Sequence, residues 1–235
     1  MPNPVLVPGA VAIVTGGAAG IGLAAAKAFA RLGLKITIAD IGQERLGSAA
    51  EQIAALSQDG AANVMACECD VSRVEDLKRL ESDVLGRFGS INVLMNNAGI
   101  QPGSQIFGPA ENWQRVIDVN LWGIINGVQT IAPGMIEFGQ PGLIINTGSK
   151  QGITTPPGDP AYNVAKAGVK AFTEALQHDL RNREGCKVTA HLLIPGFVAM
   201  YVLAWRRGRD RGLVDRVVDG ALGPICAIVL ITGAG

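Results

Sequence analysis

The 235-residue sequence has few aromatic residues, only 5%, and no net charge, because 20 Lys and Arg balance 20 Asp and Glu. This balance gives no overall field to attract nucleic acid or anionic lipid, so we expect neither as a partner. No apolar stretch reaches the roughly 20 residues of a membrane span. The N-terminal residues lack the basic start and small-residue cleavage site of a secretion signal. The sequence therefore predicts a cytoplasmic protein.

Cysteine and histidine are also scarce, with four cysteines and two histidines. Cys67 and Cys69 are separated by one residue rather than two, and no histidine follows at zinc-like spacing, so we expect no metal site. Alternation along a strand explains the pair better, which favours reduced cysteines. No carboxylate is placed to make a triad with His178 or His191, and no G-x-S-x-G elbow is present, which argues against a hydrolase.

Aliphatic residues and glycine dominate what remains: hydrophobic residues make up 48%, and there are 31 glycines. Short β-branched runs alternate with longer helical patterns, which is typical of a parallel sheet with helices on both faces. We predict a single-domain α/β fold over residues 1–235, a Rossmann-like doubly wound parallel sheet. The expected strands are Val11–Thr15, Lys35–Asp40, Asn63–Glu68, Ile91–Met95, Leu143–Thr147 and Lys187–Leu193. The expected helices are Ile21–Leu32, Gln43–Ser57, Val74–Phe88, Glu111–Glu137 and Ala161–Arg183.

Two further segments lie outside these strands and helices. Residues 152–160 read GITTPPGDP and indicate a loop. Ile225–Thr232 is an apolar run that could form a last strand.

A glycine-rich loop, Thr15–Gly22, follows the first expected strand and opens the first helix. Glycines allow a tight turn and close approach of the backbone to a pyrophosphate, and the helix N-terminus offers unpaired N–H groups. Asp40 ends the next strand, where its carboxylate could accept hydrogen bonds from the ribose hydroxyls of adenosine and repel a 2′-phosphate. This favours NAD over NADP, although Asp40 could instead cap the helix that follows.

Tyr162 and Lys166 are four residues apart in a helical pattern, so they lie on one face of the helix. A tyrosine titrates near pH 10 in water. A nearby cation would lower its pKa and allow proton exchange with an alcohol or ketone. The pair is common by chance, so its weight depends on the motifs around it.

These motifs together resemble the short-chain dehydrogenase/reductase family through about Val198. The matching positions, in the family's order and spacing, are the T-G-x-x-x-G-I-G loop at 15–22, Asp70-Val71, Asn96-Asn97-Ala98-Gly99, Asn120, Ser149, Tyr162-x-x-x-Lys166 and Pro195-Gly196. Taken singly, Ser149, Asn120 and Asp70 could be turn or cap residues.

The resemblance implies a catalytic role for four of these residues. Tyr162 would be the general acid and base, and Lys166 would lower its pKa and hold the nicotinamide ribose. Ser149 would polarise the substrate oxygen. Asn120 would bind a water that relays protons from Lys166 to solvent.

The resemblance also implies the contacts to NAD. Asp70 would bind the adenine amino group with Val71 beside it, Asn97-Ala98-Gly99 would lie under the cofactor, and Pro195-Gly196 would close over the nicotinamide. The full expected cofactor set is Gly16, Gly20, Ile21, Gly22, Asp40, Asp70, Val71, Asn97, Ala98, Gly99, Tyr162, Lys166, Pro195, Gly196 and Val198.

The segment 197–235 departs from the family pattern. No Thr follows Pro195-Gly196 at the family position, and an Arg-rich stretch, AWRRGRDRG, stands where a mostly apolar substrate loop is usual. It could be a lid for an acidic substrate, an interface or surface segment, or an abnormal tail. We expect an NAD-dependent oxidoreductase acting on a secondary alcohol or ketone, assembled as a homotetramer or homodimer. The alternative is an NAD-binding protein with little or no catalysis.

Overall fold

The computed structural model describes residues 4–195 and 229–231. One seven-stranded sheet has the order β3-β2-β1-β4-β5-β6-β7. β1 to β6 are parallel, and β7 runs antiparallel to β6. The strands are β1 (Val11–Thr15), β2 (Lys35–Asp40), β3 (Val64–Glu68), β4 (Val93–Asn96), β5 (Gly142–Thr147), β6 (Val188–Ile194) and β7 (Val229–Ile231).

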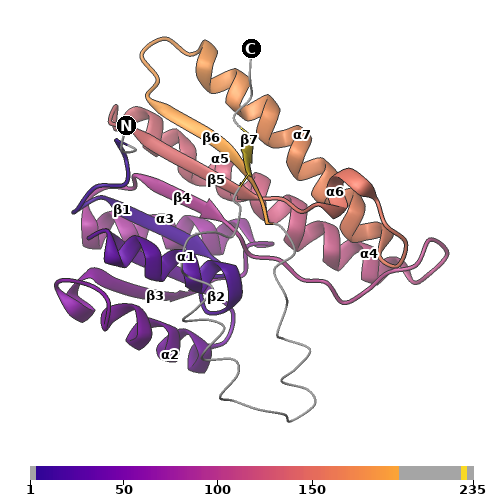
Figure 1. The fold of residues 1–235 in the computed structure, drawn as a ribbon, viewed down its shortest axis with the longest axis horizontal. Coiled ribbons are helices and arrows are strands. Elements are labelled where there is room, and N and C mark those ends of the chain that lie inside the picture. The colour runs from indigo at the N-terminus through magenta and orange to yellow at the C-terminus, as the bar shows by residue number, and fades with distance from the viewer. Residues whose placement is uncertain (1–3, 196–228, 232–235) are drawn as a thin grey trace.

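Helices cover both faces of this sheet (Figure 1). They are α1 (Gly20–Arg31), α2 (Gln43–Ala54), α3 (Val74–Phe88), α4 (Ala110–Ile117), α5 (Gly123–Glu137), α6 (Gln151–Thr154) and α7 (Pro160–Asn182), with a 3₁₀ turn η1 (Gly60–Asn63) and a π-helical turn η2 (Asp118–Trp122). One core lies between the sheet and α1 and α2, and the other between the sheet and α3, α5 and α7. The prediction of a doubly wound α/β fold is confirmed. None of the described helices has the length and apolar character needed to cross a membrane.

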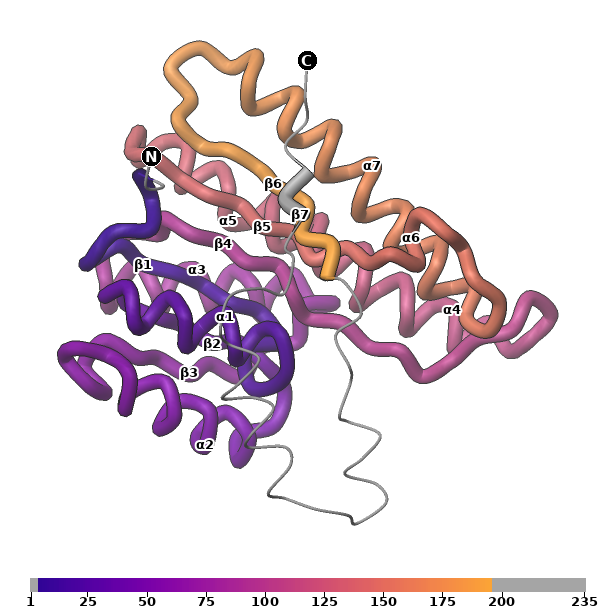
Figure 2. The backbone as a smooth tube through the Cα atoms, viewed as in Figure 1, coloured from indigo at the N-terminus to yellow at the C-terminus, as the bar shows by residue number. Residues whose placement is uncertain are grey.

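The chain builds the sheet outward from its centre. Figure 2 shows β1 to β3 on one side, in indigo and purple, and β4 to β6 on the other, in magenta to orange. β1 and β4 are neighbours, so the strand order reverses between them. Ligands of such sheets bind outside the carboxyl ends of the strands at this point.

Several expected elements differ in the structure. The helix expected over Glu111–Glu137 is divided into α4, η2 and α5, because a π-helical turn interrupts the regular pattern at Asp118–Trp122. The loop expected over 152–160 is preceded and partly replaced by α6, a single turn that ends at Thr155 in the left-handed conformation, φ 43°. Strand boundaries shift by one or two residues at β3, β4, β5 and β6, and α2 ends at Ala54 rather than at Ser57.

The last strand is antiparallel rather than a continuation of the parallel set. β7 is described over Val229–Ile231, within the apolar run that suggested it. The Arg-rich stretch and most of 197–235 lie outside the described residues, so the atypical character of this segment stays a prediction.

Candidate active site

The glycine loop lies at the carboxyl end of β1, at the reversal point of the sheet. Gly16 and Gly20 adopt positive φ angles of 64° and 55°. A Cβ on Gly16 would lie 2.7 Å from the Ala98 Cα, and a Cβ on Gly22 would lie 2.2 Å from the Gly16 carbonyl oxygen. The sequence therefore needs glycine at these positions to fold the loop this tightly.

The first turn of α1 has the features of an anion site. Its N-cap residue, Ala19, makes no side-chain hydrogen bond to the helix, so no side chain caps the first N–H groups. A Cβ on Gly20 would meet nothing within 4 Å, which leaves space for a ligand to approach the backbone there. Ile21, the second residue of α1, packs against the core on that face of the sheet. These features fit the pyrophosphate of a dinucleotide.

Asp40 joins the end of β2 to the glycine loop. Its carboxylate accepts hydrogen bonds from the Ala18 N–H at 3.0 Å and from the Ile41 N–H at 2.8 Å. The alternative role of helix cap does not hold, because Gly42 is the N-cap of α2 and no side chain caps that helix. Asp40 therefore faces the loop that would hold the cofactor.

Asn97 connects the glycine loop to the strand on its other side. Its Nδ2 donates to the Thr15 carbonyl at 3.1 Å and to the Gly16 carbonyl at 3.3 Å. The Thr15 hydroxyl accepts from the Asn97 and Ala98 N–H groups at 2.9 and 3.2 Å. The segment after β4 thus fixes the shape of the loop after β1.

Tyr162 and Lys166 lie on the first turns of α7, beside the end of β5. Pro160 occupies the first turn, where its missing N–H costs nothing, and Asp159 caps the helix. Lys166 Nζ lies 5.6 Å from the centroid of the Tyr162 ring and donates to the Thr147 carbonyl at 2.7 Å. Lys166 is 3% exposed, and this burial lowers its pKa to about 8.

Ser149 completes the set from the segment between β5 and α6. It hydrogen-bonds the Tyr162 side chain, and its hydroxyl also accepts from the Gln151 N–H at 3.1 Å. The expected three side chains are therefore brought together at one point. A hydroxyl pair beside a buried amine can exchange a proton with a substrate oxygen.

The pKa of Tyr162 differs from the sequence-based expectation. Burial raises it above 10.0, the hydrogen bond from Ser149 lowers it, and the charge of Asp159 raises it. The expected lowering of the Tyr162 pKa by Lys166 is not found, because burial disfavours both the phenolate of Tyr162 and the charged ammonium of Lys166. The expectation of a lowered Tyr162 pKa is wrong for the isolated chain.

Comparison with known proteins identifies the set of motifs as a whole. The family model described as short chain dehydrogenase matches residues 10–209. The chain belongs to the short-chain dehydrogenase family. A 3-oxoacyl-[acyl-carrier-protein] reductase of Synechocystis sp. is 34% identical over 190 residues, which are 80% of this chain and 74% of the relative.

Two solved structures are similar to this short-chain dehydrogenase. A family member from Burkholderia phymatum in complex with NAD has a TM-score of 0.79 and 34% identity over 91% of this chain and 73% of its own. An NAD+-bound xylitol dehydrogenase has a TM-score of 0.73 and 29% identity over 81% of this chain and 71% of its own. Several curated relatives are longer, and the chain spans between 64% and 74% of their length. The family is one of oxidoreductases that use a nicotinamide cofactor.

Asn120 of this short-chain dehydrogenase is fully buried in η2. Its Oδ1 accepts from the Ile100 N–H at 2.8 Å, and its Nδ2 donates to the Ile100 carbonyl at 2.7 Å. A Cβ on Gly99 would lie 2.7 Å from the same Oδ1. The side-chain amide therefore binds the backbone that follows Gly99, and the proton-relay water expected at Asn120 stays a prediction.

Asp70 and Val71 lie after β3, on the adenine side of the expected cofactor site. Asp70 Oδ1 accepts from the N–H and the hydroxyl of Ser72 at 3.0 and 2.7 Å. It does not cap α3, whose N-cap is Arg73. Val71 is buried, and a Cβ on Gly123 would lie 2.6 Å from it. The adenine contacts of both residues stay predictions.

Pro195 ends the continuous described segment, directly after β6. Gly196 and Val198, also expected at the cofactor, lie outside the described residues. Free cysteines are found at Cys67, Cys69 and Cys186. No group of three His, Cys, Asp or Glu side chains in the described segments could hold a metal ion.

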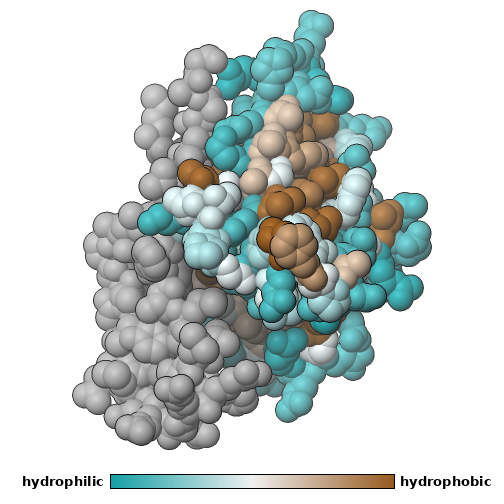
Figure 3. All heavy atoms as spheres, turned by 90° about the vertical axis from the view of Figure 1, so that its right-hand side faces the viewer, coloured by the Kyte–Doolittle hydropathy of each residue, from teal (hydrophilic) through white to brown (hydrophobic). Residues whose placement is uncertain are grey.

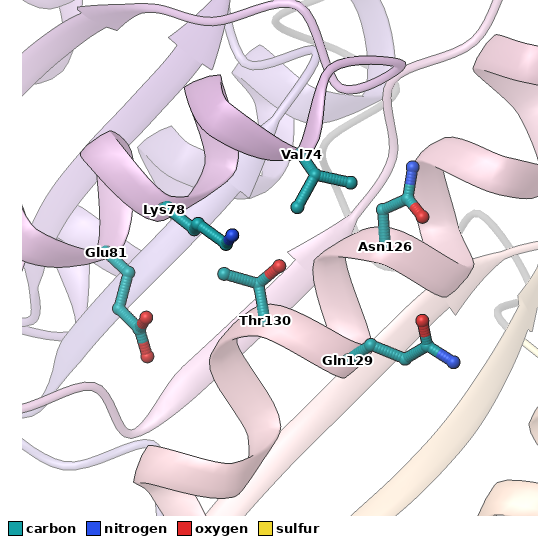
Figure 4. A pocket seen from close by; sticks show the side chains of 6 residues that line it. All are labelled: Val74, Lys78, Glu81, Asn126, Gln129 and Thr130. Atoms are coloured by element: carbon teal, nitrogen blue, oxygen red, sulfur yellow. The ribbon is translucent and has the colours of Figure 1, made fainter.

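A separate hollow of about 310 Å³ lies between α3 and α5 (Figure 4). It is lined by Val74, Lys78, Glu81, Asn126, Gln129 and Thr130. None of these belongs to the set at the strand ends, so the hollow is a second surface feature rather than the cofactor site. Burial raises the pKa of Glu81 within it.

Sequence reasoning missed several residues that hold the site together. Thr147 offers the carbonyl that Lys166 binds, and its hydroxyl donates to Asn97 Oδ1 at 3.3 Å. Arg45 Nη2 donates to the Ile41 carbonyl at 2.9 Å, which brings a guanidinium near the turn after Asp40. The contacts of Thr147 join segments 19 and 50 positions apart, so spacing does not reveal them, whereas Arg45 bonds a carbonyl only four residues away.

Proposed function

We propose that this protein is an NAD-dependent oxidoreductase that interconverts a secondary alcohol and a ketone. One observation carries the proposal. Ser149, Tyr162 and Lys166 lie close together at the carboxyl ends of the strands, where the glycine loop leads into α1 and no side chain caps that helix. A nicotinamide bound there would accept or donate the hydride. The protein would supply the proton transfer and the position of the substrate.

Tyr162 is the group that would exchange the proton with the substrate oxygen. Its hydrogen bond to Ser149 places two hydroxyl groups side by side, so one substrate oxygen could contact both. Donation to a developing negative charge on that oxygen favours the reacting state over the bound ketone. Lys166, buried behind the ring, would hold the ribose and stabilise the phenolate when charged.

The activity test compares the wild-type chain with Tyr162→Phe over a panel of secondary alcohols with NAD. We expect wild-type turnover with at least one alcohol and a loss of about 10²–10⁴-fold in the variant, because general acid–base catalysis typically contributes that factor. NADH affinity, measured by fluorescence titration, should fall far less than turnover, because Tyr162 is one of many residues in the expected cofactor set. Near-native turnover of the variant would refute the assignment, and NADH binding without any wild-type turnover would favour the non-catalytic alternative.

The preference for NAD rests on the position of Asp40. Its carboxylate already lies on the glycine loop, where a 2′-phosphate would bring a second negative charge. Arg45 stands close by and is held by the Ile41 carbonyl. We expect Asp40→Ser to weaken NADH binding and to strengthen NADPH binding, since Arg45 would then face the phosphate without a competing carboxylate. A variant that still prefers NADH as strongly as the wild type would contradict this role.

We also propose that the chain assembles with copies of itself. Figure 3 shows hydrophobic side chains gathered on the side of the molecule where α4 and α7 lie. Trp122 and Val164, in η2 and α7, are half-exposed. These apolar side chains would allow helices of two copies to pack against each other. Light scattering should give the mass of a dimer or tetramer, and a monomeric mass would reject the proposal.

We propose a cytoplasmic location, because the cysteines within the described residues, Cys67, Cys69 and Cys186, are free, which is consistent with a reducing compartment.

A further inference from the structure

The loop before α4 is tied to the start of the helix that carries Tyr162. Ser104, from this loop, donates through its hydroxyl to Asp159 Oδ1 at 2.5 Å. The same hydroxyl accepts from the Ala161 N–H at 2.9 Å. Ser104 and Asp159 are each only 6% exposed, so the tie is made away from water. It joins two segments that are 55 positions apart in the chain.

Asp159 has a second connection, to Tyr162 itself. As the N-cap of α7, it accepts from the Tyr162 N–H at 3.4 Å through the same Oδ1. Its other oxygen, Oδ2, is buried and has no hydrogen-bond partner among the described residues. A carboxylate with one unpaired buried oxygen is costly to keep, which indicates that more than a helix cap is required here.

We propose that Asp159 is a positioning residue for the reaction, which locks the loop at Ser104 onto the catalytic helix and keeps a buried negative charge one turn from Tyr162. This inference rests on the proposed alcohol–ketone chemistry at Tyr162. The loop at Ser104 would form one wall of the substrate site, because Gln101, earlier in the same loop, donates to Gln151 of α6 at 3.4 Å. The hydrogen bond between Ser104 and Asp159 would therefore align that wall with the hydroxyl group of Tyr162, which exchanges the proton with the substrate.

The charge of Asp159 has a predictable effect on the proton transfer. It is one of the causes that raise the pKa of Tyr162, together with burial and against the hydrogen bond from Ser149. Oxidation of an alcohol requires Tyr162 to accept a proton, so its rate falls as pH decreases through that pKa. Removing the charge of Asp159 should therefore shift this fall in the oxidation rate to lower pH.

Other charged groups near the start of α7 do not share this effect. Lys166 lies on the same helix, and its Nζ is 5.6 Å from the ring. The elements packed against α7 also carry Lys150 before α6, Glu111 and Arg115 on α4, and Asp118 in η2. Among the described residues, the causes that move the pKa of Tyr162 are burial, Ser149 and Asp159.

The test uses Asp159→Asn, which keeps the size and the capping ability of the side chain and removes its charge. The chain has two tyrosines, Tyr162 and Tyr201, so a Tyr201→Phe background leaves one phenol to follow. In protein labelled with ¹³C at tyrosine Cζ, we expect Asp159→Asn to lower the titration midpoint of Tyr162 by roughly 0.5–1 pH unit, the size expected from one nearby charge. The acid limb of kcat/KM should move by the same amount.

The control is Asp179→Asn, the same change at an exposed position on α7, where Asp179 pairs with Arg183. It should leave the Tyr162 midpoint unchanged. If Asp159→Asn does not fold, Asp159→Ser offers a second uncharged cap. Ser104→Ala, which keeps the charge and removes the tie, should raise KM several-fold without lowering the midpoint.

A folded Asp159→Asn or Asp159→Ser protein whose Tyr162 midpoint is unchanged or higher would overturn the role of the charge. Unchanged KM in Ser104→Ala would overturn the alignment of the loop. A wild-type chain that turns over no alcohol or ketone would instead refute the proposed function. The ¹³C titration needs no turnover, so it separates the two failures.

Discussion

Replacing Asn120 by leucine removes both hydrogen bonds that its amide makes to Ile100, while the volume of the side chain is nearly kept. The Ile100 N–H and carbonyl, at 2.8 and 2.7 Å from the amide, lose their partners. Asn120 is 0% exposed, so water does not replace the amide without a change in packing. Ile100 itself is only partly buried, so each lost hydrogen bond costs about 0.5–1.5 kcal/mol, and we expect a loss of roughly 1–3 kcal/mol in the free energy of unfolding.

Urea denaturation followed by circular dichroism measures this loss directly. A small domain has about 5–15 kcal/mol of stability in total, so the expected loss is a large part of it. NADH affinity should fall as well, because Ile100 directly follows the Asn97–Gly99 segment that holds the glycine loop.

The control is Asn126→Leu, the same substitution at a partly exposed position on α5 in the hollow beside α3. It should change the free energy of unfolding by less than about 0.5 kcal/mol. If Asn120→Leu costs less than about 1 kcal/mol, the amide does not hold this backbone as described.

Two further predictions concern the glycine loop and the buried lysine. Gly22→Ala should abolish NADH binding in a fluorescence titration, because its Cβ would lie 2.2 Å from the Gly16 carbonyl oxygen, whereas Gly47→Ala, with nothing within 4 Å, should bind normally. Burial lowers the pKa of Lys166 from 10.5 to about 8, so between these values the unfolded chain binds more protons and stability rises with pH. Lys166→Met should lack this rise in urea denaturation between pH 8 and pH 10, and an identical rise in the variant would show that another group causes it.

Much of the fold was readable from the sequence because its signals are local. β1, β2 and α3 begin and end where the apolar runs and the helical pattern do. The π-helical turn at Asp118–Trp122 was not readable, because the hydrophobic pattern continues through it. Asn120, within this turn, bonds Ile100, which is 20 positions away in the chain.

The sequence likewise predicted part of the site. Ser149, Tyr162 and Lys166 were found from spacing, and the structure brings them together. The direction of the Tyr162 pKa was not, because it depends on burial rather than on which charges are near in sequence. The tie between Ser104 and Asp159 also joins segments too far apart for spacing to reveal.

The proposed function requires that the glycine loop, Ser149 and Tyr162 form one binding site. A crystal structure of the chain with NAD and a ketone or alcohol tests this most directly. We predict the pyrophosphate at the first turn of α1, the adenosine ribose at Asp40, and the substrate oxygen in contact with Ser149 and Tyr162. NAD bound in the hollow between α3 and α5, or a substrate oxygen away from both hydroxyl groups, would contradict it.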